Sequence, residues 1–402
     1  MLGWQVADGS DWACLLHAYG PAGDTPGHLR ALTGGVLSAQ LEALDHLSYS
    51  VVHQYSVYPV TPFAVRIVGG VLGDPSLRRS ASETTPLLAG VLDFLDEVAY
   101  SIGAADSAGG PAGTTTLTWS DVGVTCDDVI GYFDALENNH LDSLDGSALQ
   151  RLWEWSMVDL RAALAELVDV VLPLIDDQEP SVRVRSVHLA TRLGGVSTVA
   201  SRAQDLVANF EARLQWMKTR DERAALVVGV GELGGDTRLW LDDDDEPVRV
   251  CASVYLHADP RATAALQGAL TRPQALAGWF EEAPWRHQGV REALLRELVS
   301  RDLSFADLLP VAVAIAKDAS KWFPDGDWGL LLRRAFPEVK FEPGIQPTSP
   351  SALDRSQRAF LEALLANDSL WDPKNGSCRL ARMKAGIPQD RREVIELLRR
   401  TR

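Results

Sequence analysis

The chain has 402 residues, 46% of them hydrophobic, and carries 55 acidic against 38 basic side chains, a formal net charge of −17. That length suits two or three ordinary domains or one long repeat array, with enough apolar residues for a large core. The charge argues against nucleic-acid binding, which needs a surface rich in Lys and Arg, and it favours a protein partner with a basic patch.

No apolar run approaches the roughly 18 residues that a membrane-spanning helix needs, so we expect no membrane association. The start, MLGWQVADGSDW, lacks the basic and apolar regions of a secretory signal, and we therefore expect a cytoplasmic protein. The four cysteines are scattered and form no CxxC pair, which argues against a zinc cluster or a disulfide framework. We expect them to be isolated buried thiols: Cys14, Cys126, Cys251 and Cys378.

Residues 1–102 have mostly helical patterns and are predicted to form N-terminal helical repeats. The segment 53–62 interrupts them, because Pro59 and Pro62 favour extended backbone at the residue before each. Aromatic and imidazole side chains gather beside this break and are candidates for binding a partner or a small molecule: His53, Tyr55 and Tyr58.

Residues 103–125 are rich in Gly, Ala, Ser and Thr, and Trp119 is their one large aromatic. Such a segment buries too little surface to order itself as a unit, so we predict a flexible insertion. A plain loop is the simpler interpretation, and a lid over a binding site is the alternative.

Residues 126–335 are predicted to be the central repeats. Apolar residues recur at three- and four-residue steps over 147–175, which indicates one long helix or two abutting ones. The acidic turn before Pro180 suits the start of another helix, which should end at Gly194-Gly195.

The tract Val182-Arg183-x10-Gly194-Gly195 recurs as Glu222-Arg223-x10-Gly234-Gly235, and further copies open at Arg249 and Arg291. These arginines are 40, 26 and 42 residues apart, and two of the three intervals match a helical-pair repeat of about 40 to 47 residues. Sustained period-two alternation is absent. We therefore predict an all-α fold: an α-solenoid of helical hairpins.

Four prolines mark residues 336–351 as a linker. Beyond it, residues 352–402 are predicted to form a small helical C-terminal unit, with helices near 353–366, 377–385 and 389–400.

The stretch from Leu172 to Arg183, LPLIDDQEPSVR, resembles the HEAT-repeat consensus, in which an outer helix ends at an Asp-Pro turn and the inner helix opens with Val-Arg. The stretch from Asp244 to Arg249 is similar. The whole chain resembles a group of bacterial HEAT-like (PBS-lyase-type) repeat proteins of unassigned function. This resemblance implies a binding scaffold more than any one reaction, and a repeat arginine that pairs with a turn Asp of a neighbouring repeat.

Motifs for catalysis are weak. Gly229 to Gly234 matches G-x-G-x-x-G, but a dinucleotide site needs a strand before it and a helix is expected there, so Gly234 is read as a helix terminus. The acidic run 242–246 lacks the alternation of a calcium loop and is read as a solvated turn. We predict no catalytic residue, no cofactor and no metal ligand.

Further candidate partner-binding residues lie on the repeats and among the 12 tryptophans, with helix packing as the alternative for each: Arg183, His188, Tyr255, Trp279, Trp285 and Trp322. The leading hypothesis is a non-enzymatic scaffold that binds a partner protein through the concave face, in one version as an immunity or antitoxin-like protein. The alternatives are an enzyme on a HEAT-like solenoid, of the DNA glycosylase or lyase type, and a small-molecule-binding protein.

Overall fold

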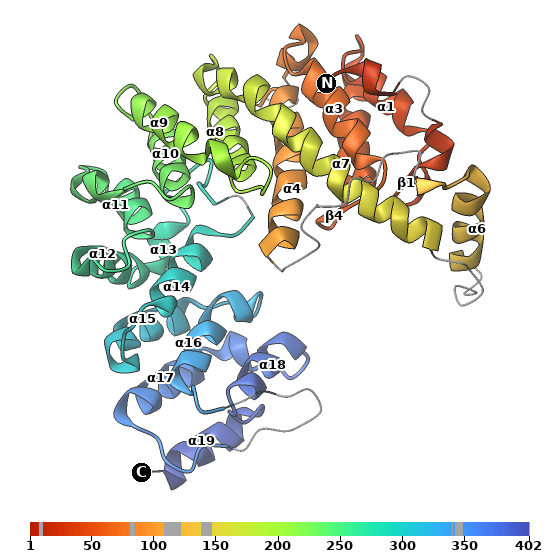
Figure 1. Ribbon diagram of the computed structural model, residues 1–402. Coiled ribbons are helices and arrows are strands. Elements are labelled where there is room, and N and C mark those ends of the chain that lie inside the picture. Colours follow the sequence, from red (N-terminus) through yellow and green to blue (C-terminus); the bar gives the residue numbers. More distant parts are fainter. Residues whose placement is uncertain are drawn as a thin grey trace. The chain divides into compact units, whose positions relative to one another are not determined.

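The computed structural model describes the chain except residues 8–10, 81–84, 108–121, 138–146, 286, 340, 342–348 and 402. Over the described residues the fold is all-α, as predicted, with two short β-hairpins as the only strands there (Figure 1). The chain divides into two compact units, which we describe separately: an N-terminal unit of residues 1–217 and 232–235, and a C-terminal unit of residues 218–231 and 236–402. The division falls inside the segment 126–335.

The N-terminal unit contains these elements: β1 (Leu16–His17), β2 (Gly20–Pro21), α1 (Thr25–Ala31), α2 (Leu37–His46), β3 (Val52–His53), β4 (Ser56–Val57), α3 (Thr61–Val71), α4 (Leu87–Ser107), α6 (Cys126–Glu137), α7 (Ser147–Val171), α8 (Pro180–Gly194) and α9 (Ala203–Leu214). β1 pairs with β2 and β3 with β4, both antiparallel. Helix α4 continues to Ser107, so the first five residues of the expected insertion 103–125 are helical. Residues 108–121 of that insertion lie outside the described residues.

Two helix pairs form the core of this unit: α3 packs on α7, and α4 packs on α8. Helix α3 is buried without interruption from Thr61 to Gly69, which suits a central helix. Gly69 is required there, because a Cβ atom at this position would lie 2.5 Å from Leu167 of α7. Arg66 of α3 forms an ion pair with Asp159 of α7 at 2.6 Å, which joins the two helices beside their apolar contact.

The C-terminal unit contains α10 (Arg220–Glu232) up to Gly231, followed by these helices: α11 (Glu246–Ser253), α12 (Pro260–Leu270), α13 (Pro273–Leu276), α14 (Val290–Ser300), α15 (Phe305–Asp318), α16 (Trp328–Ala335), α17 (Arg355–Ala366), α18 (Gly376–Lys384) and α19 (Arg391–Arg400). Contacts run mainly between helices close in sequence, as expected for a solenoid-like fold. Helix α17 packs on α15, so the predicted C-terminal segment 352–402 belongs to the same compact unit as α15. Half of the predicted linker 336–351, residues 340 and 342–348, lies outside the described residues.

The repeat arginines bind acidic turns. In the N-terminal unit Arg78 forms an ion pair with Asp177 at 2.5 Å, and Arg183 donates to the backbone oxygens of Asp177 and Gln178. In the C-terminal unit Arg223 pairs with Asp243, and Arg249 donates to the backbone oxygen of the same residue. Arg183 and Arg249 therefore bind the turn before their own helix, whereas Arg78 and Arg223 join such a turn to another helix.

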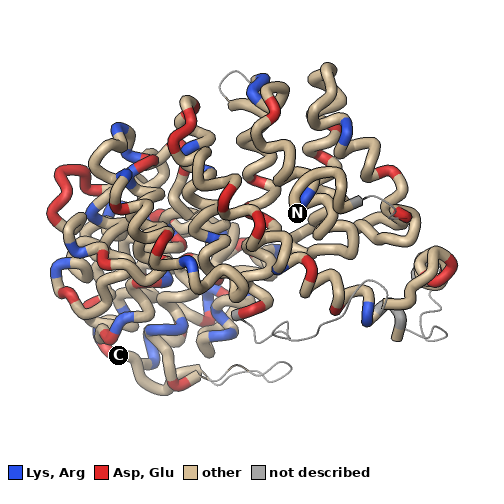
Figure 2. The backbone as a smooth tube through the Cα atoms, turned by 45° about the horizontal axis from the view of Figure 1, so that its top comes forward, with Lys and Arg blue, Asp and Glu red and all other residues tan. Residues whose placement is uncertain are grey.

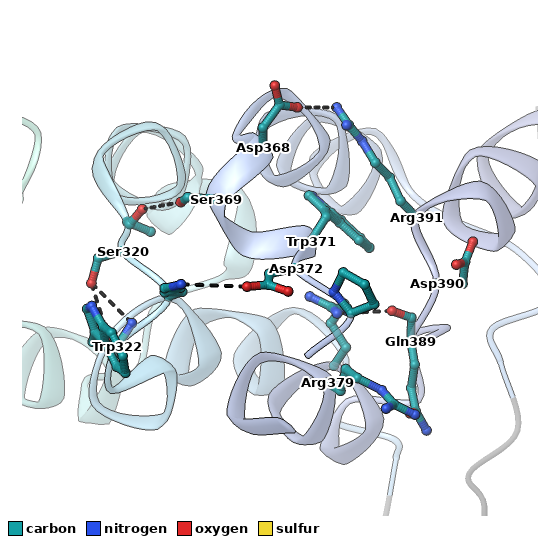
Figure 3. A pocket seen from close by; sticks show the side chains of 14 residues that line it. Ser320, Trp322, Asp368, Ser369, Trp371, Asp372, Arg379, Gln389, Asp390 and Arg391 are labelled. Atoms are coloured by element: carbon teal, nitrogen blue, oxygen red, sulfur yellow. Dashed lines mark hydrogen bonds and ion pairs between the residues drawn. The ribbon is translucent and has the colours of Figure 1, made fainter. Parts of the chain in front are cut away.

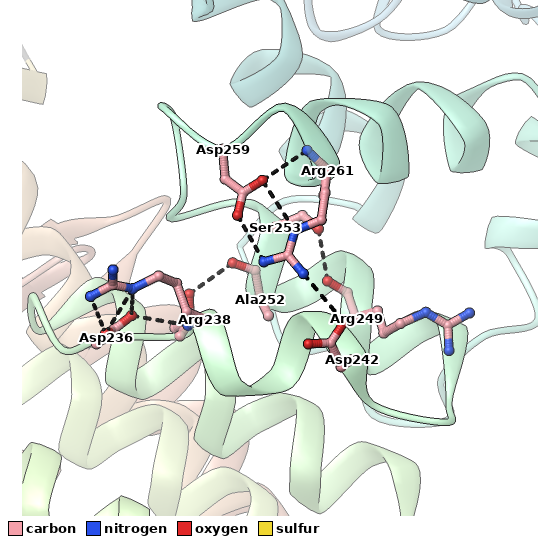
Figure 4. Close-up of polar contacts among 9 residues, drawn as sticks. Asp236, Arg238, Asp242, Arg249, Ala252, Ser253, Asp259 and Arg261 are labelled. Carbon is pink, nitrogen blue, oxygen red and sulfur yellow. Dashed lines mark hydrogen bonds and ion pairs between the residues drawn. The ribbon is translucent and has the colours of Figure 1, made fainter.

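The acidic run 242–246 forms a turn before α11 with Asp242 and Asp244 exposed, as predicted, and arginines also bind several of its carboxylates. Arg261 contacts Asp242 and Asp259 (Figure 4). Arg220 pairs with Asp245 at 2.9 Å, and Arg272 pairs with Glu246. The run therefore serves as an anchor for guanidinium groups within its own unit.

The expectation of four isolated thiols was wrong for two of them. Cys14 and Cys126 form a disulfide that joins the short 3-10 helix Trp12–Cys14 to the first residue of α6, across 112 residues of sequence. Cys251 and Cys378 are free and buried. None of the described helices combines the length and the apolar character needed to cross a bilayer.

Candidate functional site

Six of the seven tyrosines belong to the N-terminal unit, and ring contacts link several of them around the β3–β4 hairpin. The Tyr19 ring lies 5.4 Å from that of His53, the Tyr55 ring 5.3 Å from that of Tyr100, and the Tyr58 ring 5.6 Å from that of Trp153. We call the following set the tyrosine surface: Tyr19, Tyr49, His53, Tyr55, Tyr58, Tyr100, Tyr132 and Trp153. The three residues predicted at the break, His53, Tyr55 and Tyr58, all belong to it.

Three members of the tyrosine surface project into solvent. Tyr19 is 64% exposed, Tyr49 is 61% exposed and Tyr55 is 51% exposed. Tyr58 is half-buried, and burial, followed by the neighbouring Tyr19 and Tyr132, raises its pKa, so its phenol stays neutral and able to donate a hydrogen bond. Exposed large aromatics grouped in this way are typical of a binding surface.

The hairpin that carries Tyr55 is conformationally strained. Gln54 and Tyr55, the two residues between β3 and β4, have φ angles of 49° and 63°. This left-handed geometry suits a two-residue hairpin turn, but Asn-Gly is the pair that adopts it readily. A side chain there costs about 1 kcal/mol per residue, and such strain is concentrated at functional sites.

Histidines lie beneath this surface. His17 Nδ1 accepts a hydrogen bond from the Tyr19 amide, so its proton sits on Nε2, which donates to the Asp24 carboxylate at 3.1 Å. His46 lies 2.9 Å from the Thr25 hydroxyl and stacks on His28 with ring centroids 4.2 Å apart. Burial, followed by the His28 charge, lowers the pKa of His46 to about 4, so it is neutral at pH 7.

His17, Asp24 and His46 are close enough to hold a metal ion between them. A metal on His17 Nε2 would leave the proton on Nδ1, where it would face the Tyr19 N–H group. The hydrogen bonds therefore favour a proton at Nε2, and this cluster shapes the loop that presents Tyr19.

The unit that holds the tyrosine surface is acidic. Residues 80–150 contain 12 Asp and Glu and no Lys or Arg. The N-terminal unit holds 28 acidic against 11 basic residues, a net charge of −17, whereas the C-terminal unit holds 27 of each. Figure 2 shows the contrast, with blue segments sparse along the trace around the N-terminus and frequent near the C-terminus. All of the formal net charge thus belongs to the unit with the tyrosines.

The structure gives the predicted repeat residues internal roles. Arg183 binds its own preceding turn, and His188 is buried in α8. Tyr255 packs on Gly231 of α10, and Trp285 is only 5% exposed. Trp279 is half-buried against Phe280, and its backbone oxygen accepts from Arg220.

Trp322 differs from the other candidate tryptophans, because it is 66% exposed and borders a cavity of about 820 Å³ (Figure 3). The cavity lies in the C-terminal unit, between the α15–α16 loop, the segment before α18, and the α18–α19 loop. Trp371, Arg379, Arg382 and Gln389 also line it.

These cavity residues and the other tyrosines were not predicted from the sequence. For the tyrosines, the available signal is that six of the seven lie before residue 133. No sequence pattern singles out the cavity residues. A scan against protein-family models and a search of the curated proteins find no match to this chain.

Proposed function

We propose that this chain is a non-enzymatic interaction scaffold of HEAT-like helical pairs, which binds a protein partner with a basic patch through its tyrosine surface. The observation that carries the proposal is that the exposed Tyr19, Tyr49 and Tyr55 belong to the unit that holds 28 acidic against 11 basic residues. Tyr buries a large area at a small cost in side-chain entropy, and it is enriched at binding hot spots.

The acidic residues and the tyrosine rings of this unit both favour a partner whose surface carries Lys and Arg. Exposed carboxylates of the same unit, such as Asp45, four residues before Tyr49, and Asp127 of α6, would attract Lys and Arg. A cation that reaches the surface can also lie over a Tyr face, as the guanidinium of Arg192 already does over Tyr100 at 5.2 Å.

The strained hairpin supports a binding role. Gln54-Tyr55 keeps a large side chain where Asn-Gly would be more stable, and Tyr55 gains no burial in return, since it stays half exposed. An exposed aromatic held at a cost to stability is explained by a partner that covers it.

The HEAT-like identity belongs to the proposal and is supported by the Arg223–Asp243 pair, which matches the arginine role that the resemblance implies. An immunity or antitoxin-like protein that covers a basic toxin domain is one specific version. Cytoplasmic location also belongs to the proposal, although the Cys14–Cys126 disulfide is more common in oxidising compartments.

The glycosylase or lyase alternative is less well supported. A glycosylase needs a basic groove with aromatic side chains, but the repeat arginines bind acidic turns and the aromatic surface is acidic. Small-molecule binding through His53, Tyr55 and Tyr58 would use the same surface as the protein partner.

Site-specific photocrosslinking tests the proposal. The full chain, with a photoreactive phenylalanine analogue at Tyr49, is irradiated in native lysate of the source cell, and the adducts are identified by mass spectrometry. A matched protein carries the analogue at Trp216, which is also exposed, at 72%, on the same unit. We expect one reproducible adduct with a basic protein from position 49 and none from position 216.

A second arm uses Tyr19→Ser combined with Tyr49→Ser, which leaves the core intact because both side chains are exposed. The adduct of an analogue at Tyr55 should disappear in this variant and persist in Trp216→Ser. Equal adducts from positions 49 and 216, or adducts with acidic proteins only, would contradict the proposal.

A further inference from the structure

Arg382 of α18 is a buried cation with no carboxylate partner among the described residues. It is only 2% exposed, and its two terminal nitrogens donate to the backbone oxygens of Leu370 and Gln389. Its Nε has no hydrogen-bond partner there. A guanidinium has five N–H groups, and a buried charge is stabilised well only by a counter-ion.

A second guanidinium stands one turn earlier on the same helix. Arg379 is exposed and directs Nε and one terminal nitrogen to the side-chain oxygen of Gln389, at 3.0 Å and 2.8 Å. Both arginines line the 820 Å³ cavity and have neutral acceptors only within the described part of the chain (Figure 3).

The carboxylates around the cavity are already engaged. Asp368 pairs with Arg391 at 2.8 Å, and Asp372 lies 3.6 Å from Lys321. Asp390 caps α19 by accepting from the Arg392 amide. Among the described residues, Arg379 and Arg382 are therefore the cavity arginines with no carboxylate within ion-pair distance, and Asp390 attracts Arg382 only from farther away.

Two indole rings supply an apolar wall. Trp371 covers the Arg382 guanidinium at 4.3 Å, and its ring nitrogen donates to Leu364, so its orientation is fixed. Trp322 stands at the rim, 66% exposed. The next residue, Phe323, is 85% exposed at a φ of 52°, a strained and exposed aromatic beside the cavity.

We propose that this cavity binds a small organic anion, with its carboxylate or phosphate group paired to Arg379 and Arg382 and its flat apolar part against the two indole rings. The site is independent of the tyrosine surface and has the size of an ordinary small-molecule site. Two guanidinium groups beside an aromatic wall are the chemistry that recognises such a ligand.

Calorimetric titration of the full chain tests the proposal with four probes: phenyl phosphate, benzoate, inorganic phosphate and benzyl alcohol. We expect the two aromatic anions to bind with Kd of about 1 mM, a reasonable affinity for so few atoms. Inorganic phosphate should bind more weakly, and benzyl alcohol should not bind. Whichever of phenyl phosphate and benzoate binds with the lower Kd shows whether the site prefers a phosphate or a carboxylate group. Benzyl alcohol binding as tightly as either anion, or no heat from the anions up to about 20 mM, overturns the proposal.

Two substitutions, Arg379→Gln and Trp322→Ala, test whether the anion binds in this cavity. Both side chains are exposed, so neither substitution should disturb folding. Each should weaken the better anion about tenfold. Arg392→Gln is the matched control, because it removes one charge from an exposed arginine that does not line the cavity. Equal weakening by Arg379→Gln and Arg392→Gln would mean general attraction by positive charge and would refute the site.

Discussion

The ring of Tyr255 occupies the space that a Cβ atom on Gly231 would need, with Cδ2 only 2.1 Å from that point. The Gly229 to Gly234 match to a dinucleotide motif therefore has a packing origin. Because Gly231 has no side chain, the Tyr255 ring packs directly against the backbone of α10. Gly234, at a φ of 80°, follows the end of that helix.

Gly231→Ala should lower the free energy of unfolding by about 1–3 kcal/mol, because the added methyl group displaces the Tyr255 ring and this outweighs the gain in helix propensity. Denaturant unfolding followed by tryptophan fluorescence measures the change. Gly268→Ala in α12, where a Cβ meets open space, is the control and should be neutral or stabilising. A stable Gly231→Ala protein would show that the ring moves aside freely.

Helix ends were predictable from the sequence because their determinants are local. Pro180 begins α8 and Gly194 ends it, as the turn and glycine signals indicated. A Cβ on Gly194 would also lie 2.6 Å from Leu233, a packing requirement that no local pattern reveals.

The candidate site was only partly predictable, because exposure and proximity depend on packing between distant segments. Trp285 and Trp322 appeared equivalent in sequence, but the first is core and the second borders a cavity. The Tyr58–Trp153 contact and the Cys14–Cys126 disulfide join residues about a hundred positions apart, and no spacing rule links them.

Replacing Gln54-Tyr55 by Asn-Gly should stabilise the N-terminal unit by about 1–2 kcal/mol, because the turn geometry then costs no side-chain strain. The same change removes an exposed ring from the tyrosine surface and should weaken partner binding at least about tenfold. Thermal unfolding and a binding assay with the crosslinked partner measure the two effects. A variant that gains stability without losing affinity would exclude Tyr55 from the interface.

Reduction of the disulfide should destabilise the N-terminal unit. Cys14 and Cys126 close a loop of 112 residues, and loss of that constraint lowers the free energy of unfolding by about 2–4 kcal/mol. Dithiothreitol should lower the unfolding midpoint of the wild type and leave the double variant Cys14→Ser and Cys126→Ser unchanged. Cys251→Ser should respond to reductant as the wild type does. A midpoint insensitive to reductant would contradict the structural role of the disulfide.

Acid should also destabilise the N-terminal unit, through His46. Its pKa is about 4 when folded, below an unfolded value of about 6.5, so the unfolded chain binds the extra proton first. The stabilising contribution is present above pH 6.5 and is lost as the pH falls toward 4, by up to about 3 kcal/mol. His46→Gln should flatten the dependence of unfolding free energy on pH in that window. An unchanged slope would show that His46 is protonated in the folded protein.

Charge and aromatic residues on the tyrosine surface should act on different rate constants. Asp45→Asn combined with Asp127→Asn removes two exposed carboxylates and should slow association by about three- to tenfold at low salt, an effect that vanishes near 0.5 M salt, where screening is about 4 Å in range. Tyr49→Ala should instead speed dissociation, because it removes buried contact area after encounter. Surface plasmon resonance with the partner identified by crosslinking measures the association and dissociation rate constants separately. Asp205→Asn combined with Glu211→Gln, on α9, removes the same charge elsewhere, and an equal effect there would mean that net charge alone guides the partner.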